Sequence, residues 1–453
     1  MEMQSFSLLR KEIMKSQTRY IFVAVTAAML LASTVFAQDE PKSYSGDLWT
    51  RPALTGDWGG VRNNLAAKGV TFDISANQIE QGVDDGGRKS GGADSGRAVF
   101  NLNVDSQKLG LWPGGFLMVE AESSWGEAAN MNTGALMPAN SSQIYPWPGV
   151  EQFAIPQVAL IQFLSGYVGV VLGKFDTTSG DMNDFAHGKG DTQFLNLALN
   201  LNPVTVVSTP YSTLGAGLII LPVKENPDAA LITLSALSTD GKPSTSGFDT
   251  VANGNNVYAA EGRVRTDFFD LTGHQLVGGT YSTKTFSSID QNLRFIIENR
   301  EIEKKDGTWS AYYNFDQYLY ETKKGSGKGL GIFGRFGLSD GNPNPMHYFY
   351  SIGLGGKDVI PNRALDSFGI GYYYITINHP SFTGPLQTRN ILQDEQGFEA
   401  YYNVAITPWM RLTPDIQFIK GAQKFAVSSS NGLPAMEDIN TATVAGIRLQ
   451  VIF

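Results

Sequence analysis

The chain lacks cysteine altogether and is poor in charge. None of its 453 residues is cysteine, and Lys, Arg, Asp and Glu together make up 17% of it, below the ~25% typical of soluble domains. The missing thiols exclude structural disulfides, thiolate catalysis and cysteine-ligated zinc. They also suit a protein that crosses an oxidising compartment before it folds.

Long apolar runs and basic stripes are missing as well. After the first 37 residues no run approaches the ~20 apolar residues of a membrane helix, and the mean hydropathy is −0.14, so a membrane location would require strands. A net charge of −9 without a dense Lys/Arg stripe argues against a nucleic-acid partner. By contrast, the 50 glycines, 18 tyrosines and 26 phenylalanines favour many tight turns and aromatic girdles.

The N-terminus has the features of an export signal. Lys15 and Arg19 precede an apolar run over residues 20–36, which ends in small or branched residues of the kind that a signal peptidase reads. We therefore expect residues 1–37 to be a signal peptide, with Met14 as a possible start. The alternative is a single membrane anchor, but the run is short for spanning and lacks a basic stop-transfer flank.

From residue 70 onward the chain consists of segments of about ten residues in which apolar and polar positions alternate, a pattern typical of transmembrane strands. In residues 70–77, for example, Val, Phe, Ile and Ala alternate with Thr, Asp, Ser and Asn. We expect sixteen strands, an even number that closes an antiparallel barrel without a free edge. Their predicted ranges are 70–81, 97–108, 115–125, 157–165, 167–175, 213–222, 229–238, 256–268, 274–283, 308–319, 329–338, 347–355, 367–378, 397–406, 410–419 and 440–453.

The connections between these strands differ in length. Tight turns at 165–166, 270–273 and 407–409 contrast with long polar connections at 82–96, 126–156, 176–212 and 284–307. Short periplasmic turns and long outer loops produce this asymmetry, which a soluble sandwich has no reason to keep. The sequence therefore predicts an all-β fold, a 16-stranded antiparallel transmembrane β-barrel over residues 70–453, with a water-filled lumen. An N-terminal segment, residues 38–69, precedes it.

That segment is expected to contain a short helix. Asp57 is a candidate N-cap and Gly69 a candidate C-terminal stop. The apolar residues of the helix would share one face: Trp58, Val61, Leu65 and Ala66. A helix of about three turns must dock on something to be stable. It would cover the periplasmic rim of the barrel or, alternatively, narrow the pore.

An ordered set of motifs points to a known family. They are Leu54 to Arg62 (LTGDWGGVR), Gly173 to Asp176, Asn183 to Phe185, Gln193 to Asn196, Gly331 to Gly337, Pro361 to Arg363 with Asp366, Thr407 to Trp409, and Pro414 to Gln417. Over residues 50–453 the chain thus resembles the carbohydrate-selective porins of the OprB type. The resemblance implies a sixteen-stranded channel of the Gram-negative outer membrane that passes glucose and related sugars, usually as a homotrimer surrounded by lipid and lipopolysaccharide.

The same resemblance gives two further expectations. In such porins a terminal aromatic residue, here Phe453, is the signal read by the barrel assembly machinery. Their third outer loop folds inward and narrows the channel, which here corresponds to residues 176–212. We expect an eyelet formed with the help of Lys174, Asp176, Asp181, Asp184 and Gln193.

Charged residues at polar positions of the strands are candidates for sugar contact. These lumen candidates are Glu261, Arg263, Arg265, Arg335, Glu399 and Arg448. Opposed Arg and Glu side chains would offer a neutral sugar hydrogen bonds without a net field, although barrel interiors are commonly charged for other reasons. The aspartates of residues 176–212 could instead hold calcium, but their spacing lacks the register of a calcium loop. The run Tyr145 to Pro148 is either a sugar platform or loop scaffolding.

Other signals are weak. Gly329, Gly331 and Gly334 match GxGxxG, but no helix is expected after them, so a dinucleotide site is not predicted. The four histidines are far apart in sequence, and neither HExxH nor GxSxG occurs. We predict no catalytic residue, cofactor or metal. The main hypothesis is a sugar-permeable porin; a general or anion-preferring porin and an outer-membrane barrel hydrolase are the alternatives.

Overall fold

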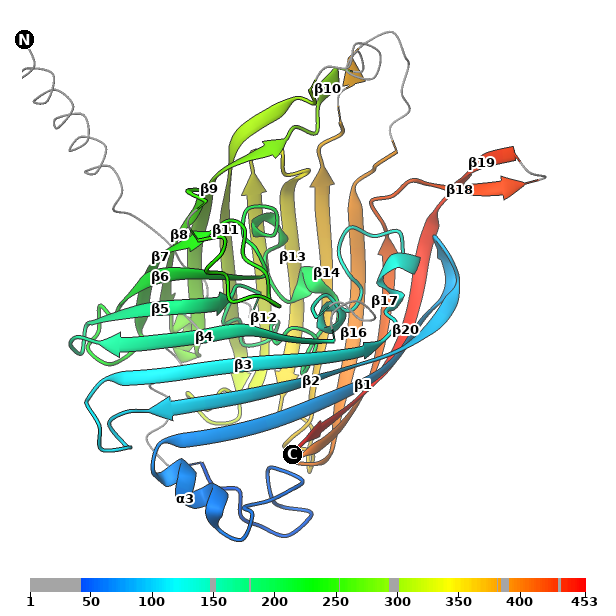
Figure 1. Cartoon of the computed structure of the whole chain (residues 1–453). Helices are drawn as coiled ribbons and strands as arrows, with labels where there is room; N and C mark the ends of the chain where they lie inside the picture. The colour runs from blue at the N-terminus through cyan, green and yellow to red at the C-terminus, as the bar shows by residue number, and fades with distance from the viewer. Residues whose placement is uncertain are drawn as a thin grey trace, which may run out of the picture.

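The described residues form a closed antiparallel β-barrel of sixteen strands (Figure 1). The computed structural model describes residues 42–453 apart from 147–151, 179–180, 252, 293–300, 381, 384–390 and 431–432. The predicted signal peptide lies outside the described residues. Among those described, no helix is long and apolar enough to cross a membrane.

Each barrel strand pairs with its neighbours in chain order, and the first pairs with the last. The strands are β1 (Val70–Gly87), β2 (Gly91–Asp105), β3 (Gly115–Gly126), β4 (Phe153–Phe163), β5 (Val168–Asp176), β6 (Ser212–Ile220), β7 (Ala230–Ser238), β8 (Asn256–Arg265), β9 (Gly273–Ser287), β11 (Lys304–Glu321), β12 (Gly329–Ser339), β13 (Met346–Lys357), β14 (Ser367–Ile377), β16 (Glu395–Thr407), β17 (Met410–Lys420) and β20 (Asn440–Ile452). The sixteen strands predicted from the alternation are therefore confirmed, with bounds that differ by a few residues.

Short strands and helices lie at the two ends of the barrel. β10 (Gln291–Asn292) pairs with β15 (Phe382–Thr383), and β18 (Phe425–Ser430) forms a hairpin with β19 (Leu433–Asp438) that projects from the upper end in Figure 1. Single-turn 3-10 helices span Ala129–Asn132, Ser141–Gln143, Leu197–Leu199, Pro203–Thr205 and Phe268–Asp270. The helix α3 (Val61–Ala67) lies at the opposite end, near the C-terminus. We call the end with the C-terminus and the short turns the turn end, and the other the loop end.

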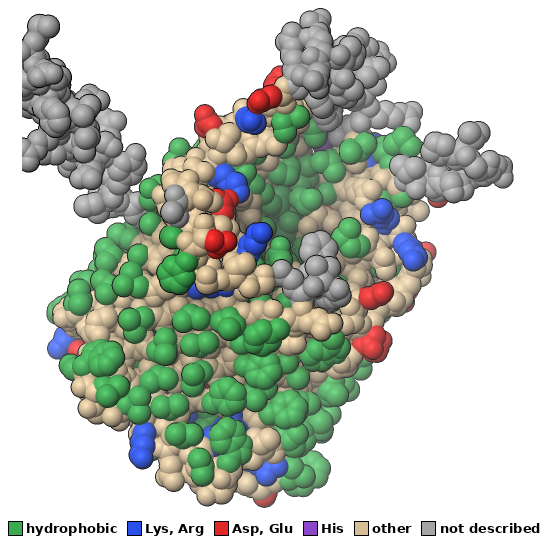
Figure 2. All heavy atoms as spheres, in the orientation of Figure 1, with side chains coloured by type: hydrophobic (Ala, Val, Ile, Leu, Met, Phe, Trp, Pro, Cys, Tyr) green, Lys and Arg blue, Asp and Glu red, His purple; other side chains and the backbone are tan. Residues whose placement is uncertain are grey.

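The two faces of the wall differ in polarity, as the alternation predicts. On β20 the side chains of Ile447 and Leu449 are exposed on the outer surface, whereas Arg448 and Gln450 between them are buried inside the barrel. Figure 2 shows apolar side chains spread over the outer surface, with charged ones mainly near its upper and lower ends. This surface matches a lipid bilayer, and the polar interior a water-filled channel.

The C-terminal residue lies at the seam where the barrel closes. β20 pairs with β1 from Ser75↔Ile452 onward, and the backbone N–H of Phe453 donates to the carbonyl of Ile74 at 2.8 Å. The N-terminal segment braces the same seam, since the N–H of Leu54 donates to the carbonyl of Ile452 at 2.7 Å. The last residues of the chain thus complete the hydrogen bonding of the first strand.

One predicted loop is wrong. Residues 82–96 were expected to form a long polar connection, but β1 and β2 continue through them, with Gly82 paired to Gly92, and only residues 88–90 connect the strands. The segment DDGGRKSGGADSG has no apolar alternation because its side chains are not required to meet lipid on one face. Backbone pairing alone extends the hairpin.

The helix exists, but its cap and its docking face differ from the prediction. Gly60, at φ 90°, is the N-cap residue, and Asp57 does not cap with its side chain. Val61 and Leu65 are exposed, whereas Arg62 and Ala66 are buried. The guanidinium of Arg62 lies 3.8 Å from the Tyr44 ring centroid and donates to the Phe72 carbonyl at 2.8 Å. A stacked arginine therefore anchors α3 to the turn end, outside the lumen (Figure 1).

Candidate pore constriction

The described residues of the connection between β5 and β6, 177–178 and 181–211, fold into the barrel; we call them the inward loop. Two of its phenylalanines pack on the inner wall. The ring of Phe185 lies 4.7 Å from that of Tyr318 on β11, and the ring of Phe194 lies 5.5 Å from Phe333 on β12 and 4.9 Å from Tyr401 on β16. All five side chains are buried. Aromatic packing thus holds the loop against the β11 to β16 side of the lumen.

Glycines on that wall make room for the loop. A Cβ added at Gly331 would lie 2.3 Å from Cζ of Phe185, and one at Gly369 would lie 2.7 Å from Cζ of Phe194. Both distances are far inside van der Waals contact. The GxGxxG match that includes Gly331 is therefore explained by close approach of the inward loop rather than by nucleotide binding.

Buried polar side chains of the wall anchor the loop backbone. Arg335 on β12 makes two hydrogen bonds of 2.7 Å to the carboxylate of Asp181 and also donates to the carbonyls of Ala186 and Leu199. Each of these groups is nearly inaccessible to water. A bidentate arginine–carboxylate pair fixes geometry as well as charge.

Glu399 and Arg448 hold the next stretch of the loop in the same way. The Glu399 carboxylate accepts from the backbone N–H groups of Leu195 and Asn196, the latter at 2.9 Å. Arg448 donates to the carbonyls of Gly190 and Gln193. The side chain of Gln193 is itself used within the loop, where it accepts from the N–H of His187 at 2.6 Å. These predicted lumen residues do point inward, but their hydrogen bonds support the loop.

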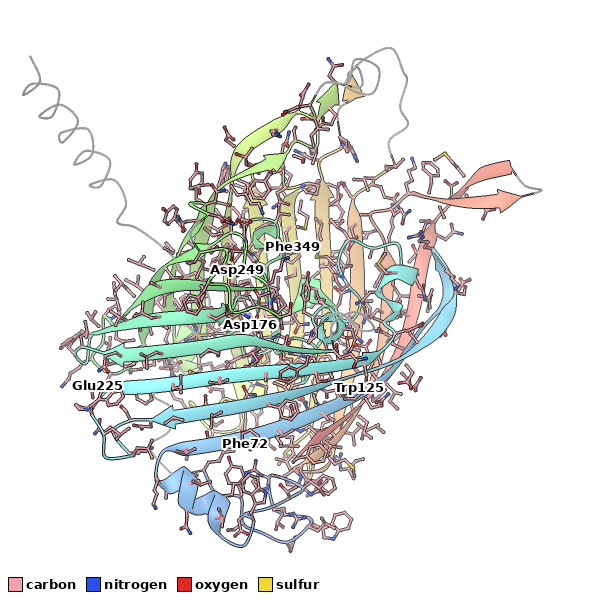
Figure 3. All side chains as sticks on the ribbon, viewed as in Figure 1. Phe72, Trp125, Asp176, Glu225, Asp249 and Phe349 are labelled. Carbon is pink, nitrogen blue, oxygen red and sulfur yellow. The ribbon has the colours of Figure 1, made fainter. Side chains whose placement is uncertain are left out.

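The tip of the inward loop meets the opposite wall through charges. Nζ of Lys189 lies 2.8 Å from the Glu122 carboxylate and 3.4 Å from that of Glu120, both on β3, and it also pairs with Asp176. Tyr211 donates its hydroxyl to Glu122. Asp176 lies where β5 ends and the loop begins (Figure 3). The loop tip is therefore bound to β3 and β5.

Arg97 extends this group of charges. Its guanidinium pairs with Glu122 and with Asp191 of the loop, the latter at 3.0 Å. We call Arg97, Glu120, Glu122, Asp176, Lys189 and Asp191 the tip cluster. The side chains of Lys189, Glu120 and Asp191 keep 13%, 16% and 17% of their surface exposed. These three side chains are therefore the part of the tip cluster that solvent can reach.

The charge on Lys189 is stabilised by its surroundings. Burial works against the ammonium form, but the nearby carboxylates of Asp176 and Glu122 outweigh it and raise the pKa of Lys189 well above its ordinary value. A cation is thus fixed at the loop tip in the physiological pH range.

Lys174 does not join the tip cluster. It pairs across the strands with Val158 and Leu214, and its ammonium donates at 2.8 Å to the carbonyls of Ile155 and Pro243. Since Val158 is exposed on the outer surface, Lys174 lies on the outward face of β5, under the β7–β8 loop. Its predicted place in the eyelet is therefore wrong, because strand alternation turns it away from the lumen.

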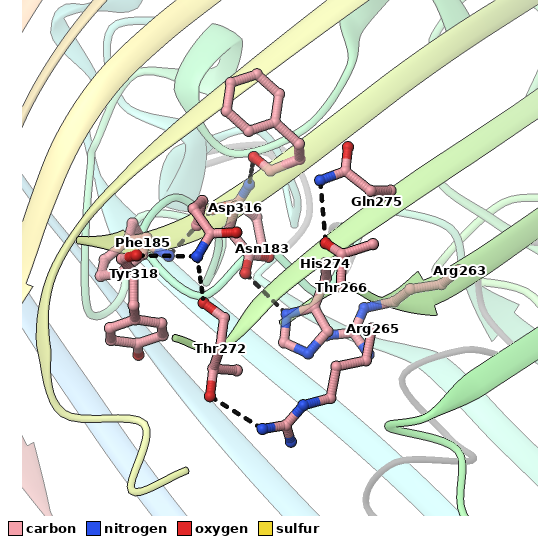
Figure 4. Close-up of polar contacts among 12 residues, drawn as sticks. Asn183, Phe185, Arg263, Arg265, Thr266, Thr272, His274, Gln275, Asp316 and Tyr318 are labelled. Atoms are coloured by element: carbon pink, nitrogen blue, oxygen red, sulfur yellow. Dashed lines mark hydrogen bonds and ion pairs between the residues drawn. The ribbon is translucent and has the colours of Figure 1, made fainter. Parts of the chain in front are cut away.

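A second polar cluster occupies the inner wall near the turn end (Figure 4). His274 on β9 contacts the carboxylate of Asp316 at 2.8 Å, a contact drawn in Figure 4. On its other side, it lies 3.1 Å from the carboxylate of Asp228. Arg265 pairs with Asp228 at 2.7 Å, and the guanidinium of Arg263 is 3.6 Å from it. The His274 hydrogen bond, followed by that of Arg265 and by the charge of Arg263, lowers the pKa of the Asp228 carboxyl despite its partial burial.

The remaining predicted residues are distributed around these clusters. Asp184 reaches from the loop to within 4.8 Å of ligand atoms of His274 and Asp316, and Glu261 accepts from the Tyr312 hydroxyl at 2.5 Å. Asp176, Asp181 and Asp191 pair with three different basic residues. The loop aspartates therefore do not converge on the calcium site considered as an alternative.

Sequence reasoning missed Arg97, Glu120, Glu122, Lys189 and Asp191. Glu120 and Glu122 occupy alternating polar positions of a predicted strand, which would have indicated their inward orientation. No local signal marks Lys189 or Asp191, because their role depends on where the loop tip docks.

A closed sixteen-stranded barrel with an apolar exterior, a polar interior and a loop folded into its lumen defines a porin-type channel. More specifically, the chain belongs to the family described as carbohydrate-selective porin, OprB family, whose model matches residues 89–453. It is a family of channels, not of enzymes. The barrel and the family together place the chain in the bacterial outer membrane.

Individual relatives agree with this assignment. Porin B of Pseudomonas aeruginosa is 22% identical over 441 residues, which cover 88% of this chain and 91% of that protein. A high-pH structure of Pseudomonas putida OprB shares the fold with a TM-score of 0.72 at 20% identity, covering 91% of this chain and 100% of the other. Its low-pH structure gives a TM-score of 0.55 at 16% identity, covering 89% and 99%.

Proposed function

We propose that the chain forms a passive outer-membrane pore through which glucose and other small neutral sugars diffuse. The observation that carries the proposal is the inward loop, which three buried polar wall residues and the packing of two loop phenylalanines hold inside the lumen, with its charged tip fixed against β3. A permanently docked loop narrows a sixteen-stranded barrel, which would otherwise leave a wide aqueous channel.

The chemistry at the loop tip suits a polar, uncharged solute. Sugar hydroxyls both donate and accept hydrogen bonds, and the exposed edges of Lys189, Glu120 and Asp191 offer both kinds of partner within one cluster. We assign direct solute contact to these three residues first. Among the residues singled out from sequence, Asp184 and Arg265 keep partial exposure and remain candidates for contact.

The tip cluster contains more acidic than basic side chains. Four carboxylates, those of Glu120, Glu122, Asp176 and Asp191, face two cations, Arg97 and Lys189. This excess argues for a preference for cations over anions among small ions. An anion-preferring pore, one alternative considered from sequence, is not favoured by it.

Assembly and targeting form part of the proposal. We infer that residues 1–37 are removed on export, that residues 38–69 and their helix brace the periplasmic rim, and that the barrel over 70–453 assembles as a homotrimer in lipid and lipopolysaccharide. Phe453, whose N–H completes the bonding of β1 at the seam, would be read by the barrel assembly machinery.

Planar-bilayer recording tests the function. Purified protein should give stable ion currents that fall and become noisier as glucose is added, because bound sugar obstructs the pore. A current that is insensitive to any sugar, together with preferential passage of simple ions, would favour a general porin. Lipid turnover by the purified protein would instead favour the barrel hydrolase.

A further inference from the structure

A small cavity lies beside the tip cluster, between the inward loop and the β3–β4 connection. Its volume is ≈ 230 Å³. It is lined by Ile144, Tyr145, Thr177, Thr178, Leu197, Leu201, Thr205, Val206, Thr209, Pro210 and Tyr211. A space below the ~300 Å³ at which drug-sized pockets begin suits a single small ring rather than an oligosaccharide.

The lining carries no charge, in contrast to the tip cluster. None of the eleven residues is acidic, basic or histidine, so an ionic solute would find no counter-charge there. Apolar side chains and the stacked rings of Tyr145 and Tyr211, 4.8 Å apart, offer surface to the C–H faces of a ring. The lining therefore favours a neutral solute with one apolar face.

Two of the four threonine hydroxyls that line the cavity are oriented by the backbone. Thr205 donates to the carbonyl of Asn202 at 3.0 Å, and Thr177 donates to those of Pro210 and Tyr211. Because each donates its only proton, its oxygen retains lone pairs that can accept from a solute hydroxyl. Hydroxyl-rich solutes are thus matched at the polar edge of the cavity.

Tyr211 connects the cavity to the constriction. Its ring lines the cavity, its hydroxyl donates to Glu122, and Nζ of Lys189 lies 5.2 Å from its ring centroid. A solute in the cavity would therefore be one side chain away from the exposed edge of the tip cluster.

We propose that this cavity, next to the constriction, is a binding subsite for a single neutral pyranose ring. The proposal rests on the sugar-pore function proposed above and adds a defined place of binding to it. The apolar residues and the tyrosine pair would contact the ring faces, and the threonine oxygens would accept from its hydroxyls.

Two substitutions with opposite effects on the cavity volume test the subsite. Val206 is 43% exposed and lines the cavity, so V206W would fill it; Y145L would remove an aromatic face without filling it. V251W is the matched control, because Val251 is 47% exposed in the β7–β8 loop and does not line the cavity. The readout is glucose-dependent current noise in planar bilayers, from which an apparent dissociation constant is obtained.

We expect V206W and Y145L each to weaken glucose binding at least tenfold, and V251W to match the wild type. Glucose binding that persists in both cavity variants would overturn the subsite while leaving the pore function intact. Weakening by V206W alone would also overturn it, since that result indicates simple narrowing of the channel. A wild-type protein without any glucose response would instead overturn the proposed function on which the subsite depends.

Discussion

The docking of the inward loop can be tested at Phe194. Its side chain is fully buried between Phe333 and Tyr401, and Gly369, which has no Cβ, leaves the space that the Phe194 ring occupies. Truncating such a phenylalanine to alanine costs about 3–5 kcal/mol in well-packed cores. Because each ~1.4 kcal/mol is a factor of ten, F194A should lower the ratio of docked to undocked loop by roughly a hundredfold to a few thousandfold.

The hydrogen bonds from Arg335, Glu399 and Arg448 to the inward loop remain in F194A. We therefore expect part of the loop to leave the inner wall frequently, rather than the whole loop to detach from it. Single-channel records should show increased open-channel noise and a higher mean conductance, and liposome swelling should extend to larger sugars. F248A provides the control, since Phe248 is 74% exposed. If F194A matches both F248A and the wild type in noise, conductance and size limit, the loop is not held by this packing.

Three further predictions concern charge. K189Q removes one of the two cations of the tip cluster, so the reversal potential in a KCl gradient should shift toward stronger cation preference; a shift toward chloride would contradict the assignment. K174M should leave the reversal potential unchanged because Lys174 faces outward. An effect as large as that of K189Q would show that Lys174 faces the lumen instead. In the turn between β13 and β14, burial opposes ionisation of Asp366, but Arg363 at 2.8 Å, Tyr402 and the Ala405 N–H outweigh it and lower its pKa. A carboxyl whose pKa is depressed in the folded chain stabilises the fold at a pH above its pKa in the unfolded chain, ~3.9. That stabilisation is lost as the pH falls through its pKa in the folded chain. D366N should therefore unfold more easily on heating at pH 7, by roughly 1 kcal/mol, and the difference from wild type should shrink as the pH falls through the folded-state pKa of Asp366; a difference that does not change with pH would argue against the ion pair.

The barrel could be predicted from sequence because lipid imposes a strict local rule. One face of each strand must be apolar, so the alternation at Ile447, Arg448, Leu449 and Gln450 locates a wall residue and its orientation without knowledge of its neighbours. The rule ends where the membrane ends. For that reason the paired extension of β1 and β2 beyond Gly82 was mistaken for a loop.

The constriction could be predicted only in part. Alternation gave the inward direction of Arg335, Glu399 and Arg448, but their role as loop anchors depends on backbone carbonyls and amides more than 130 residues away in sequence. Lys189 has no sequence signal, since its partners come from β3 and β5. At the helix, Gly60 replaced Asp57 as N-cap because the turn requires a positive φ, which glycine adopts without strain.

The most direct test of the sugar pore is a liposome-swelling panel with the purified wild-type protein. The account predicts that proteoliposomes swell rapidly in glucose and other monosaccharides, and progressively more slowly as the sugar becomes larger, relative to liposomes without protein. Failure to swell in any sugar, under conditions where the same preparation conducts small ions, would contradict it.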